Sequence, residues 1–392
     1  PMTISDFSIN PIVLQEDSET LDEVVVVGYG TQKKAHLTGA IATVPMDQIK
    51  DLADGNLASS LSGLVNGLSV VGGDGQPGDP ASMYVRGVRD LGDVGSKVQQ
   101  PLFVIDGVVY NNDVKVGNVY TNPGAEAFNN LDPNDVESIT VLKDASAAVY
   151  GSRAANGVIL VTTKKGKIGE PVISYSGTFG FTDAVSRPKM LNSYDYGRLY
   201  NAMAAADPTN TTLNHRTGLF QADELAAMRG LNYDLLDENW KTGFTMKHSV
   251  GVSGATEKAN YYANIGYFDQ DGNIGRLDYN RWNYRAGVDV TLKKWIKASL
   301  QISGDYGDKN KPLVKVGGSS DEKAYNLLLT HPRYIPEYVN GMPVAVYGPT
   351  NTQVNQDQNY NHTVLQNLGD YNRNTTSNLQ INTGLSLDFG FI

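Results

Sequence analysis

The regular alternation of apolar and polar residues in the second half of the chain most constrains its fold. Between residues 282 and 292 every even position is apolar and every odd position is polar or glycine. A period of two is that of β-strands with one apolar face. Similar patterns recur from about Pro171 onward and predict six strands. These are residues 173–181, 246–252, 261–267, 282–292, 296–306 and 379–391.

The connections between these strands alternate in length. Residues 183–243 and 307–375 form long connections, 271–279 an intermediate one, and 255–258 and 293–295 short turns. Short turns at one end and long loops at the other are typical of an outer-membrane β-barrel. A secreted β-sandwich, whose apolar stripe faces a dry core, remains an alternative. Strand lengths near the ~9–11 residues of a membrane strand favour the barrel.

The chain up to about Gly166 has a different texture, with brief strands and short helical stretches. Leucines at 57, 61 and 64 have helical spacing, and Asp144 can cap a helix over residues 145–150. Residues 133–137 predict a helical turn, and residues 111–130 a linker. The predicted strands are 38–44, 68–71, 83–85, 102–105, 139–142 and 158–163. This mixture predicts a small α/β module.

Composition excludes several functions. The chain has no cysteine, so disulfides, cysteine nucleophiles and thiolate metal sites are impossible. With 32 basic and 42 acidic residues the formal net charge is −10, which makes nucleic acid an unexpected partner. The longest apolar run is five residues, so we expect no membrane-spanning helix. No leader opens the sequence, and we expect any export signal to have been removed.

Four motifs in order carry a family resemblance. They are LDEVVVVGYGTQKK at residues 21–34, YVRG at 84–87, PLFVIDGV at 101–108 and NDVESITVLKDASAAVYGSRAANGVILVTT at 134–163. Together they resemble SusC/RagA-type TonB-dependent outer-membrane transporters. Ala154 stands where the family usually has glycine, a small-for-small difference.

The resemblance implies a transmembrane antiparallel β-barrel of 22 strands with a small α/β plug domain inside. Residues 1–20 would end an N-terminal immunoglobulin-like domain and linker, 21–30 would hold the TonB box, and 31–166 would be the plug. Residues 171–392 would supply about six barrel strands with their outer loops. Six strands cannot close such a barrel, so we expect this chain to be a portion of a longer protein.

The implied function is TonB-dependent active import of an oligosaccharide or peptide nutrient across the bacterial outer membrane. The implied partners are TonB, a SusD-like surface lipoprotein and outer-membrane lipid, with a dimer of transporter–lipoprotein pairs as a further arrangement. We expect no cofactor. Two alternatives remain: a TonB-dependent receptor for a small chelate such as a siderophore, and a soluble glycan-binding β-protein.

The valine run of the first motif has a physical rationale as a docking strand. Four consecutive β-branched residues favour extended backbone, and an unpaired extended segment offers N–H and C=O groups to the sheet edge of a partner. An ordinary buried plug strand would explain the run equally simply, but the resemblance favours docking. The expected TonB-binding residues are Leu21, Asp22, Glu23, Val24, Val25, Val26 and Val27.

We expect the charged residues of the plug motifs to form structural ion pairs instead of contacting the substrate, because a polar lumen tolerates paired charges. We expect Arg285 and Asp289, two positions on the presumed lumen face, to form the wall side of such pairs. The expected plug members are Arg86, Glu137, Lys143, Asp144 and Arg153.

Substrate contacts are expected on plug loops and outer loops, because loops on a rigid scaffold usually carry binding. A plain solvated loop is an equally good explanation of the polar residues found there. The candidate residues are Arg89, Asp90, Asn111, Asn112 and Asp113, with tyrosines and asparagines of residues 307–375 behind them.

No enzyme is predicted. The five histidines are scattered without metal-ligand spacing, and neither a phosphate-binding loop nor a nucleophile elbow occurs. Residues 269–273 imitate the start of a calcium loop, but Asn280 occupies the place of the required glutamate, so a hairpin turn is the better interpretation. We therefore expect no metal site.

Overall fold

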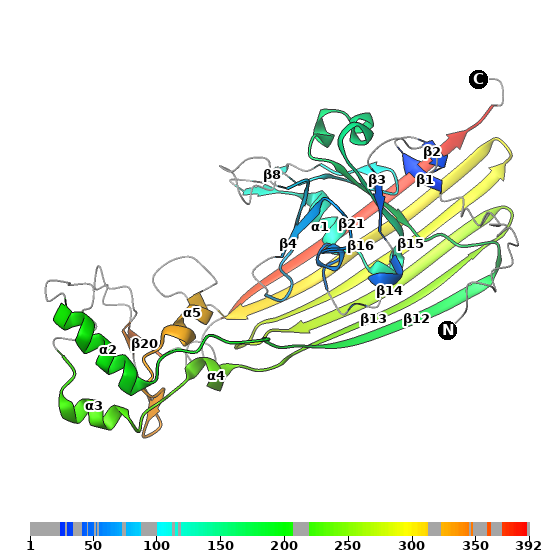
Figure 1. Cartoon of the computed structure of the whole chain (residues 1–392). Coiled ribbons are helices and arrows are strands. Elements are labelled where there is room, and N and C mark those ends of the chain that lie inside the picture. The colour runs from blue at the N-terminus through cyan, green and yellow to red at the C-terminus, as the bar shows by residue number, and fades with distance from the viewer. Residues whose placement is uncertain are drawn as a thin grey trace, which may run out of the picture.

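The computed structural model describes most of both halves of the chain. The described residues are 24–27, 30–33, 41–44, 46–50, 52, 55–72, 76–87, 100–111, 114–116, 119–206, 219–312, 323–344, 346–347, 359–361 and 371–389. A long, curved sheet carries a compact α/β domain on its concave face (Figure 1). We call the sheet the wall and the α/β domain the plug.

The wall is a meander of six antiparallel strands in the order β12-β13-β14-β15-β16-β21. The six predicted strands are therefore confirmed; each contains more residues than its pattern showed, and the last ends at Leu387 instead of continuing to residue 391. Their bounds are β12 Gly169–Thr182, β13 Gly243–Ala255, β14 Ala259–Asp271, β15 Asp278–Lys293, β16 Ile296–Pro312 and β21 Tyr371–Leu387. The predicted long loop over 307–375 is wrong at both ends, because polar residues there continue the ladder from Gly307↔Thr376 to Pro312↔Tyr371.

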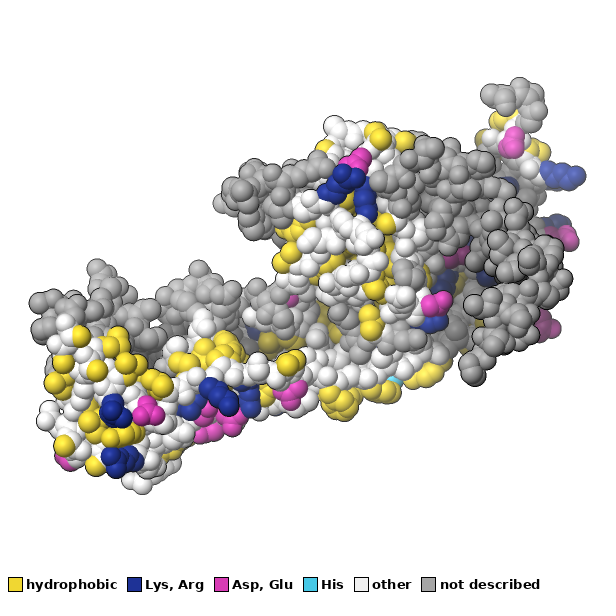
Figure 2. Space-filling view, viewed as in Figure 1, with side chains coloured by type: hydrophobic (Ala, Val, Ile, Leu, Met, Phe, Trp, Pro, Cys, Tyr) yellow, Lys and Arg dark blue, Asp and Glu magenta, His cyan; other side chains and the backbone are white. Residues whose placement is uncertain are grey.

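The two faces of the wall differ as the alternation predicted. Apolar side chains on the face away from the plug remain exposed, for example Ile173, Trp282, Leu300 and Ile381. Figure 2 shows hydrophobic side chains along part of the lower edge of the sheet. The opposite face is polar and is buried beneath the plug. Its buried residues include Thr245, Lys247, Ser249, Asn264, Arg281, Asn283, Arg285 and Asp305. A sandwich would bury the apolar face instead, so that alternative is wrong.

Aromatic rings mark both ends of the apolar band. Trp282 packs on Tyr267 with 4.6 Å between ring centroids, and Trp295 stacks on Phe389 at 5.6 Å. Trp282 and Leu292 on β15 are separated by about 33 Å at ~3.3 Å per residue. With a strand tilt of about 40° this becomes ~25 Å, the height of the apolar band of an outer-membrane barrel.

The connections of the wall are sorted between its two ends. Two short turns, 256–258 and 294–295, lie at one end, while helices and small hairpins lie at the other (Figure 1). This sorting confirms the predicted alternation of loop lengths. The elements of the long-loop end are α2 Ser193–Ala206, α3 Ala222–Met228, α4 Leu235–Asn239, α5 Lys323–Thr330, β17 Tyr338–Val339, β18 Met342–Pro343, β19 Val346–Tyr347 and β20 Asn359–Tyr360. Among the described residues, no helix is long and apolar enough to cross a membrane.

The plug is built around a five-stranded mixed sheet in the order β3-β10-β11-β6-β7. These strands are β3 Ile41–Thr43, β10 Val136–Leu142, β11 Val158–Thr163, β6 Leu102–Ile105 and β7 Val108–Val109. Two small hairpins accompany it: β4 Leu68–Val71 with β5 Ser82–Val85, and β8 Val114–Val116 with β9 Val119–Thr121. Phe103, Phe128, Ile139 and Ile159 are fully buried in its apolar core.

Several helical predictions for the plug need correction. The supposed linker 111–130 contains the hairpin β8–β9 and the helix α1 Pro123–Asn129, whose first turn is capped by the Asn122 side chain. Residues 57–64 form turns and the short 3₁₀ helix Ser59–Leu61 instead of the predicted α-helix. Leu57 and Leu61 are nevertheless buried in the core of the plug. The remaining 3₁₀ helices are Met46–Gln48, Pro133–Asp135, Asp144–Tyr150 and Ser152–Ala154. Lys143, rather than Asp144, is the N-cap residue of the third.

The valine run is a strand, but it is not unpaired. β1 Val24–Val27 pairs antiparallel with β2 Gly30–Lys33 in a two-stranded hairpin. One edge of the valine strand is therefore already paired in this conformation, contrary to the expectation of an unpaired segment, while its role in TonB binding stays a prediction. Leu21, Asp22 and Glu23 lie outside the described residues.

Candidate functional site

The predicted substrate residues lie mostly beyond what the structure describes. Arg89, Asp90, Asn112 and Asp113 are outside the described residues. Asn111 is exposed, and its side-chain oxygen accepts a hydrogen bond of 3.2 Å from Arg153 Nη1. The candidate site is instead the interface at which the plug sits on the wall.

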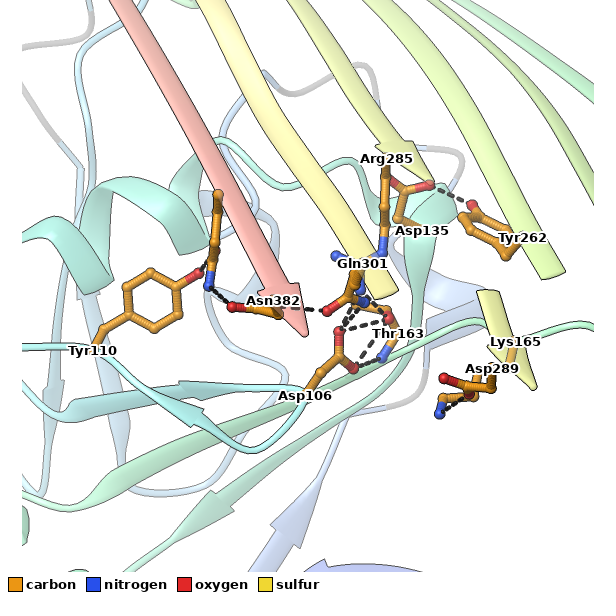
Figure 3. A network of polar contacts seen from close by, with 11 residues as sticks. Asp106, Tyr110, Asp135, Thr163, Lys165, Tyr262, Arg285, Asp289, Gln301 and Asn382 are labelled. Atoms are coloured by element: carbon orange, nitrogen blue, oxygen red, sulfur yellow. Dashed lines mark hydrogen bonds and ion pairs between the residues drawn. The ribbon is translucent and has the colours of Figure 1, made fainter. Parts of the chain in front are cut away.

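Asp106 is the centre of this interface. It follows the last residue of β6, in the Asp-Gly turn, where its φ is +49°. The carboxylate accepts hydrogen bonds from the Thr163 backbone N–H at 2.9 Å and from Gln301 Nε2 at 3.0 Å, and forms an ion pair with Arg285 (Figure 3). The Arg285 side chain is only 4 % exposed. A buried, hydrogen-bonded ion pair thus joins plug and wall.

A chain of amide side chains continues from Asp106 across the wall. Asn382 Nδ2 donates to Gln301 Oε1 at 3.4 Å, Gln380 Nε2 donates to Asn382 Oδ1 at 3.3 Å, and the Tyr110 hydroxyl of the plug donates to Gln380 (Figure 3). The chain therefore begins and ends on the plug. Such contacts lose little when water replaces each partner, because the net value of one hydrogen bond is only ~1 kcal/mol.

Arg281 makes a second junction. Its guanidinium donates to Asn130 Oδ1 at 3.0 Å and to the Gly55 carbonyl oxygen at 2.9 Å, both in the plug, and to Asn283 Oδ1 of its own strand at 3.0 Å. Asn130 Nδ2 in turn donates to Asp305 at 3.2 Å. One arginine and one asparagine thus link the plug to β15 and β16.

A carboxyl pair forms a third junction. Asp132 is the N-cap of the 3₁₀ helix Pro133–Asp135 and Asp135 is its last residue, and both are buried. Burial, reinforced by the Asp132 charge, raises the pKa of Asp135 from 3.8 to about 7. The hydroxyl of Tyr262 on β14 donates to the Asp135 carboxyl (Figure 3). This contact is therefore the part of the interface whose charge changes near neutral pH.

Two further ion pairs connect plug and wall at more exposed places. Lys165 Nζ lies 2.7 Å from Asp289, and Lys309 pairs with Asp79. The prediction that Arg285 and Asp289 form the wall side of ion pairs is therefore confirmed.

The predicted plug partners of these pairs were wrong. Arg86 pairs with Asp144 and Lys143 donates to the Asn66 carbonyl oxygen, both within the plug. Arg153 contacts Asn111, also in the plug, and Glu137 is exposed. The prediction failed because the position of a charged residue in a motif does not reveal whether it lies on the side of the plug that faces the wall.

Two wall aromatics fit into hollows that glycines leave in the plug. A Cβ on Gly55 would lie 2.3 Å from the Phe268 ring, and one on Gly78 would lie 2.5 Å from the Tyr279 ring. Gly78 also has φ of +71°, which other residues rarely adopt. These contacts make the fit of plug to wall specific in shape as well as in charge.

A cavity of about 380 Å³ lies between plug and wall beside these junctions. Plug residues Tyr110, Glu126 and Asn130 line it on one side, and wall residues Ser303 and Asn382 on the other. The residues that line the cavity carry many amide, hydroxyl and carboxylate groups, which suit water or a hydrophilic solute. Among the described residues, no group of three or more His, Asp or Glu side chains could hold a metal ion.

Comparison with known proteins agrees with this architecture. Residues 33–158 match the family model of the TonB-dependent Receptor Plug Domain. The chain is 35 % identical over 274 residues to the TonB-dependent receptor SusC of Bacteroides thetaiotaomicron, a match covering 69 % of this chain and 25 % of that protein. It is a SusC/RagA-type TonB-dependent receptor chain.

Other relatives extend the match along this SusC-like chain. The TonB-dependent receptor P26 of Formosa agariphila is 30 % identical over 371 residues, which cover 91 % of this chain and 33 % of that protein. The solved RagAB peptide importer in its "open-open" state has a TM-score of 0.64 and 27 % identity, covering 83 % of this chain and 37 % of that chain. The chain thus spans about a quarter to a third of the length of these curated relatives.

These similarities identify both the α/β domain and the six-stranded sheet. The α/β domain is the plug, and the wall is part of a transmembrane β-barrel of the bacterial outer membrane. The signal that could have found Asp106 was present in the sequence, since it belongs to the PLFVIDGV motif. Asp135 carried the same kind of signal, since it belongs to the motif at residues 134–163, whereas Tyr262 lies outside all four motifs and nothing in the sequence connects the two residues.

Proposed function

We propose that this chain acts in TonB-dependent active import of an oligosaccharide or peptide nutrient across the outer membrane, together with a SusD-like surface lipoprotein. The observation that carries the proposal is the polar interface between plug and wall. A plug that moves to admit a solute must leave the wall while exposing little apolar surface. The contacts at Asp106, Arg281 and Asp135 meet that requirement, since water can replace each partner.

The substrate class is supported by relatives and by the lining of the cavity. The RagAB structure is that of a peptide importer, and the SusC match is stronger in sequence. Amide, hydroxyl and carboxylate groups around the cavity suit the hydroxyls of sugars and the backbone of peptides alike. We keep Arg89, Asp90, Asn111, Asn112 and Asp113 as proposed substrate contacts at the loops.

The proposed test measures uptake and binding separately. In cells producing the full-length protein, deletion of residues 21–27 is expected to abolish uptake of the labelled substrate while surface binding persists. A scrambled order of the same seven residues is the matched control for length and composition. Uptake that survives the deletion would refute a role of this segment in TonB-dependent import.

The same cells distinguish the substrate classes. Labelled oligosaccharides, labelled peptides and ferric siderophores are supplied in parallel, and the proposal expects uptake of one of the first two. Uptake of only the ferric siderophore would establish the chelate-receptor alternative. A SusD-like lipoprotein is expected to copurify with the detergent-extracted protein, and its absence would argue against the proposed partner.

A further inference from the structure

The hairpin β1–β2 lies near the end of the wall that carries the short turns (Figure 1). In an outer-membrane barrel this is the periplasmic end. The register pairs Val24 with Lys33, Val26 with Thr31 and Val27 with Gly30. One edge of the valine strand is therefore already occupied by β2, in the part of the chain that a periplasmic partner would reach.

The two strands of the hairpin are unequal. β1 consists of four valines, which strongly favour extended backbone, whereas β2 contains Gly30 and Lys33, which are depleted in strands. The hairpin has four residue pairs and no third strand among the described residues. Isolated two-stranded hairpins are marginally stable in water. A better strand can therefore take the place of β2 at little cost.

Opening the hairpin also changes how far β1 reaches from the plug. The chain enters the plug sheet at Ile41, in its edge strand β3. With the hairpin closed, eight residue steps from Lys33 to Ile41 span at most about 27 Å. Val24 lies opposite Lys33 in the closed hairpin, whereas with the hairpin open seventeen steps from Val24 to Ile41 span up to about 58 Å. Opening thus lengthens the reach of Val24 by roughly 30 Å.

We propose that β2 covers β1 at rest, and that an extended strand of the partner protein replaces β2 instead of adding to the other edge of β1. The inference rests on the proposed function, in which TonB binds this segment. The partner would then gain the backbone hydrogen bonds of β1 and the longer tether in the same step. Pairing with β2 is therefore an autoinhibitory contact on the docking strand.

The absence of cysteine from the chain makes a disulfide lock a direct test. Val26→Cys and Thr31→Cys are introduced together in the full-length protein, at positions that face each other in the hairpin. Oxidation is expected to form the bond, to weaken binding of the purified C-terminal domain of TonB by at least about tenfold, and to stop uptake. Reduction should restore both. The two single-cysteine variants are the matched controls.

Each other outcome overturns the inference. A cysteine pair that does not oxidise would show that the hairpin is not the resting conformation. An oxidised protein that binds and imports as well as the reduced one would show that the partner adds to the free edge of β1. Proposed TonB docking itself fails separately, through uptake that survives deletion of residues 21–27.

A second variant tests the same idea in the opposite direction. Gln32→Pro removes a backbone donor from β2 and leaves β1 intact. We expect it to strengthen binding of the TonB domain in the absence of substrate, because β1 is exposed more often. Unchanged or weaker binding would contradict a covering role for β2.

Discussion

The plug is held together and held in place by two different kinds of contact. Its own core is apolar, and Phe103 and Phe128 pack there with ring centroids 5.4 Å apart. Its contact with the wall is mainly polar, apart from the Phe268 and Tyr279 rings, and Asp106, Arg285 and Asp135 are all buried or nearly so. The plug therefore uses apolar contacts to fold and mainly polar contacts to bind the wall.

The contrast shows which contacts the protein can give up. Apolar burial contributes about 25 cal/mol per Å² and is lost wherever the surface meets water. Polar groups that leave each other regain hydrogen bonds to water, so separation costs much less than the number of contacts suggests. A domain built in this way can leave its seat as a folded body. The following predictions test that division.

The largest effect is expected in the plug core. Phe128→Ala should destabilise the plug by about 3–5 kcal/mol, because it removes a fully buried ring and leaves a cavity. Hydrogen exchange at β10 and β11 in the detergent-purified protein measures the loss. Val149→Ala, at a residue 57 % exposed, is the control and should have little effect. If the core substitution left exchange unchanged, the wall rather than the core would stabilise the plug.

Removing the buried cation of the interface should release the plug without unfolding it. Arg285→Ala leaves the Asp106 carboxylate without its ion-pair partner, at a cost of about 3 kcal/mol. The urea concentration at which the full-length protein begins to conduct ions in a planar bilayer should fall, while hydrogen exchange in the plug core stays slow. The double variant with Asp106→Ala should recover part of the loss. Faster core exchange would show that core and interface are one cooperative unit.

The contact between plug and wall should weaken as pH rises. Burial raises the pKa of Asp135 to about 7, so the plug on the wall binds a proton that the carboxyl releases once water reaches it and its pKa returns to the ordinary 3.8. Its stabilising effect is fully present below pH 3.8 and is lost as pH rises through about 7. The loss is on the order of 2 kcal/mol once relaxation of the interface reduces the full effect. The urea midpoint for conductance, measured at several pH values, reports it.

A matched variant identifies the group responsible for this pH dependence. Asp135→Asn keeps the shape and cannot titrate, so its urea midpoint should change much less between pH 4 and 7. A slope equal to that of the unsubstituted protein would assign the pH dependence to another group.

The smallest effect is expected at the exposed ion pair. Lys165 and Asp289 join plug and wall as Arg285 and Asp106 do, but their side chains are 59 % and 42 % exposed. Lys165→Ala should reduce the free energy that holds the plug on the wall by less than about 1 kcal/mol. The resulting small shift of the urea midpoint should disappear in high salt. A loss as large as that of Arg285→Ala would mean that burial does not set the strength of these pairs.

Much of the fold was predictable because it depends on local patterns. Alternation along residues 282–292 identified a strand and its apolar face, and the lengths of the connections placed the long loops at one end. The strand predicted over 158–163 coincides with β11. These features follow from neighbouring residues, and tertiary contacts had no reason to override them.

The missed features depend on distant residues. The strands extend beyond their apolar pattern because polar residues such as Asp308 and Asn374 still pair in the ladder. One edge of the valine run is covered because it pairs with residues from Gly30 to Lys33. A β-branched run predicts extended backbone, but it does not say whether a neighbour is paired with it.

By itself, the sequence determined that this chain forms a one-sided apolar sheet joined to a small α/β domain, and its motifs identified the type of receptor. Only the tertiary structure decided how the two units meet. It brought Asp106 to Arg285, Asp135 to Tyr262, and two wall aromatics to the hollows beside Gly55 and Gly78. Such pairings join residues more than a hundred positions apart, and their geometry comes from packing two folded surfaces together rather than from any local preference of the chain.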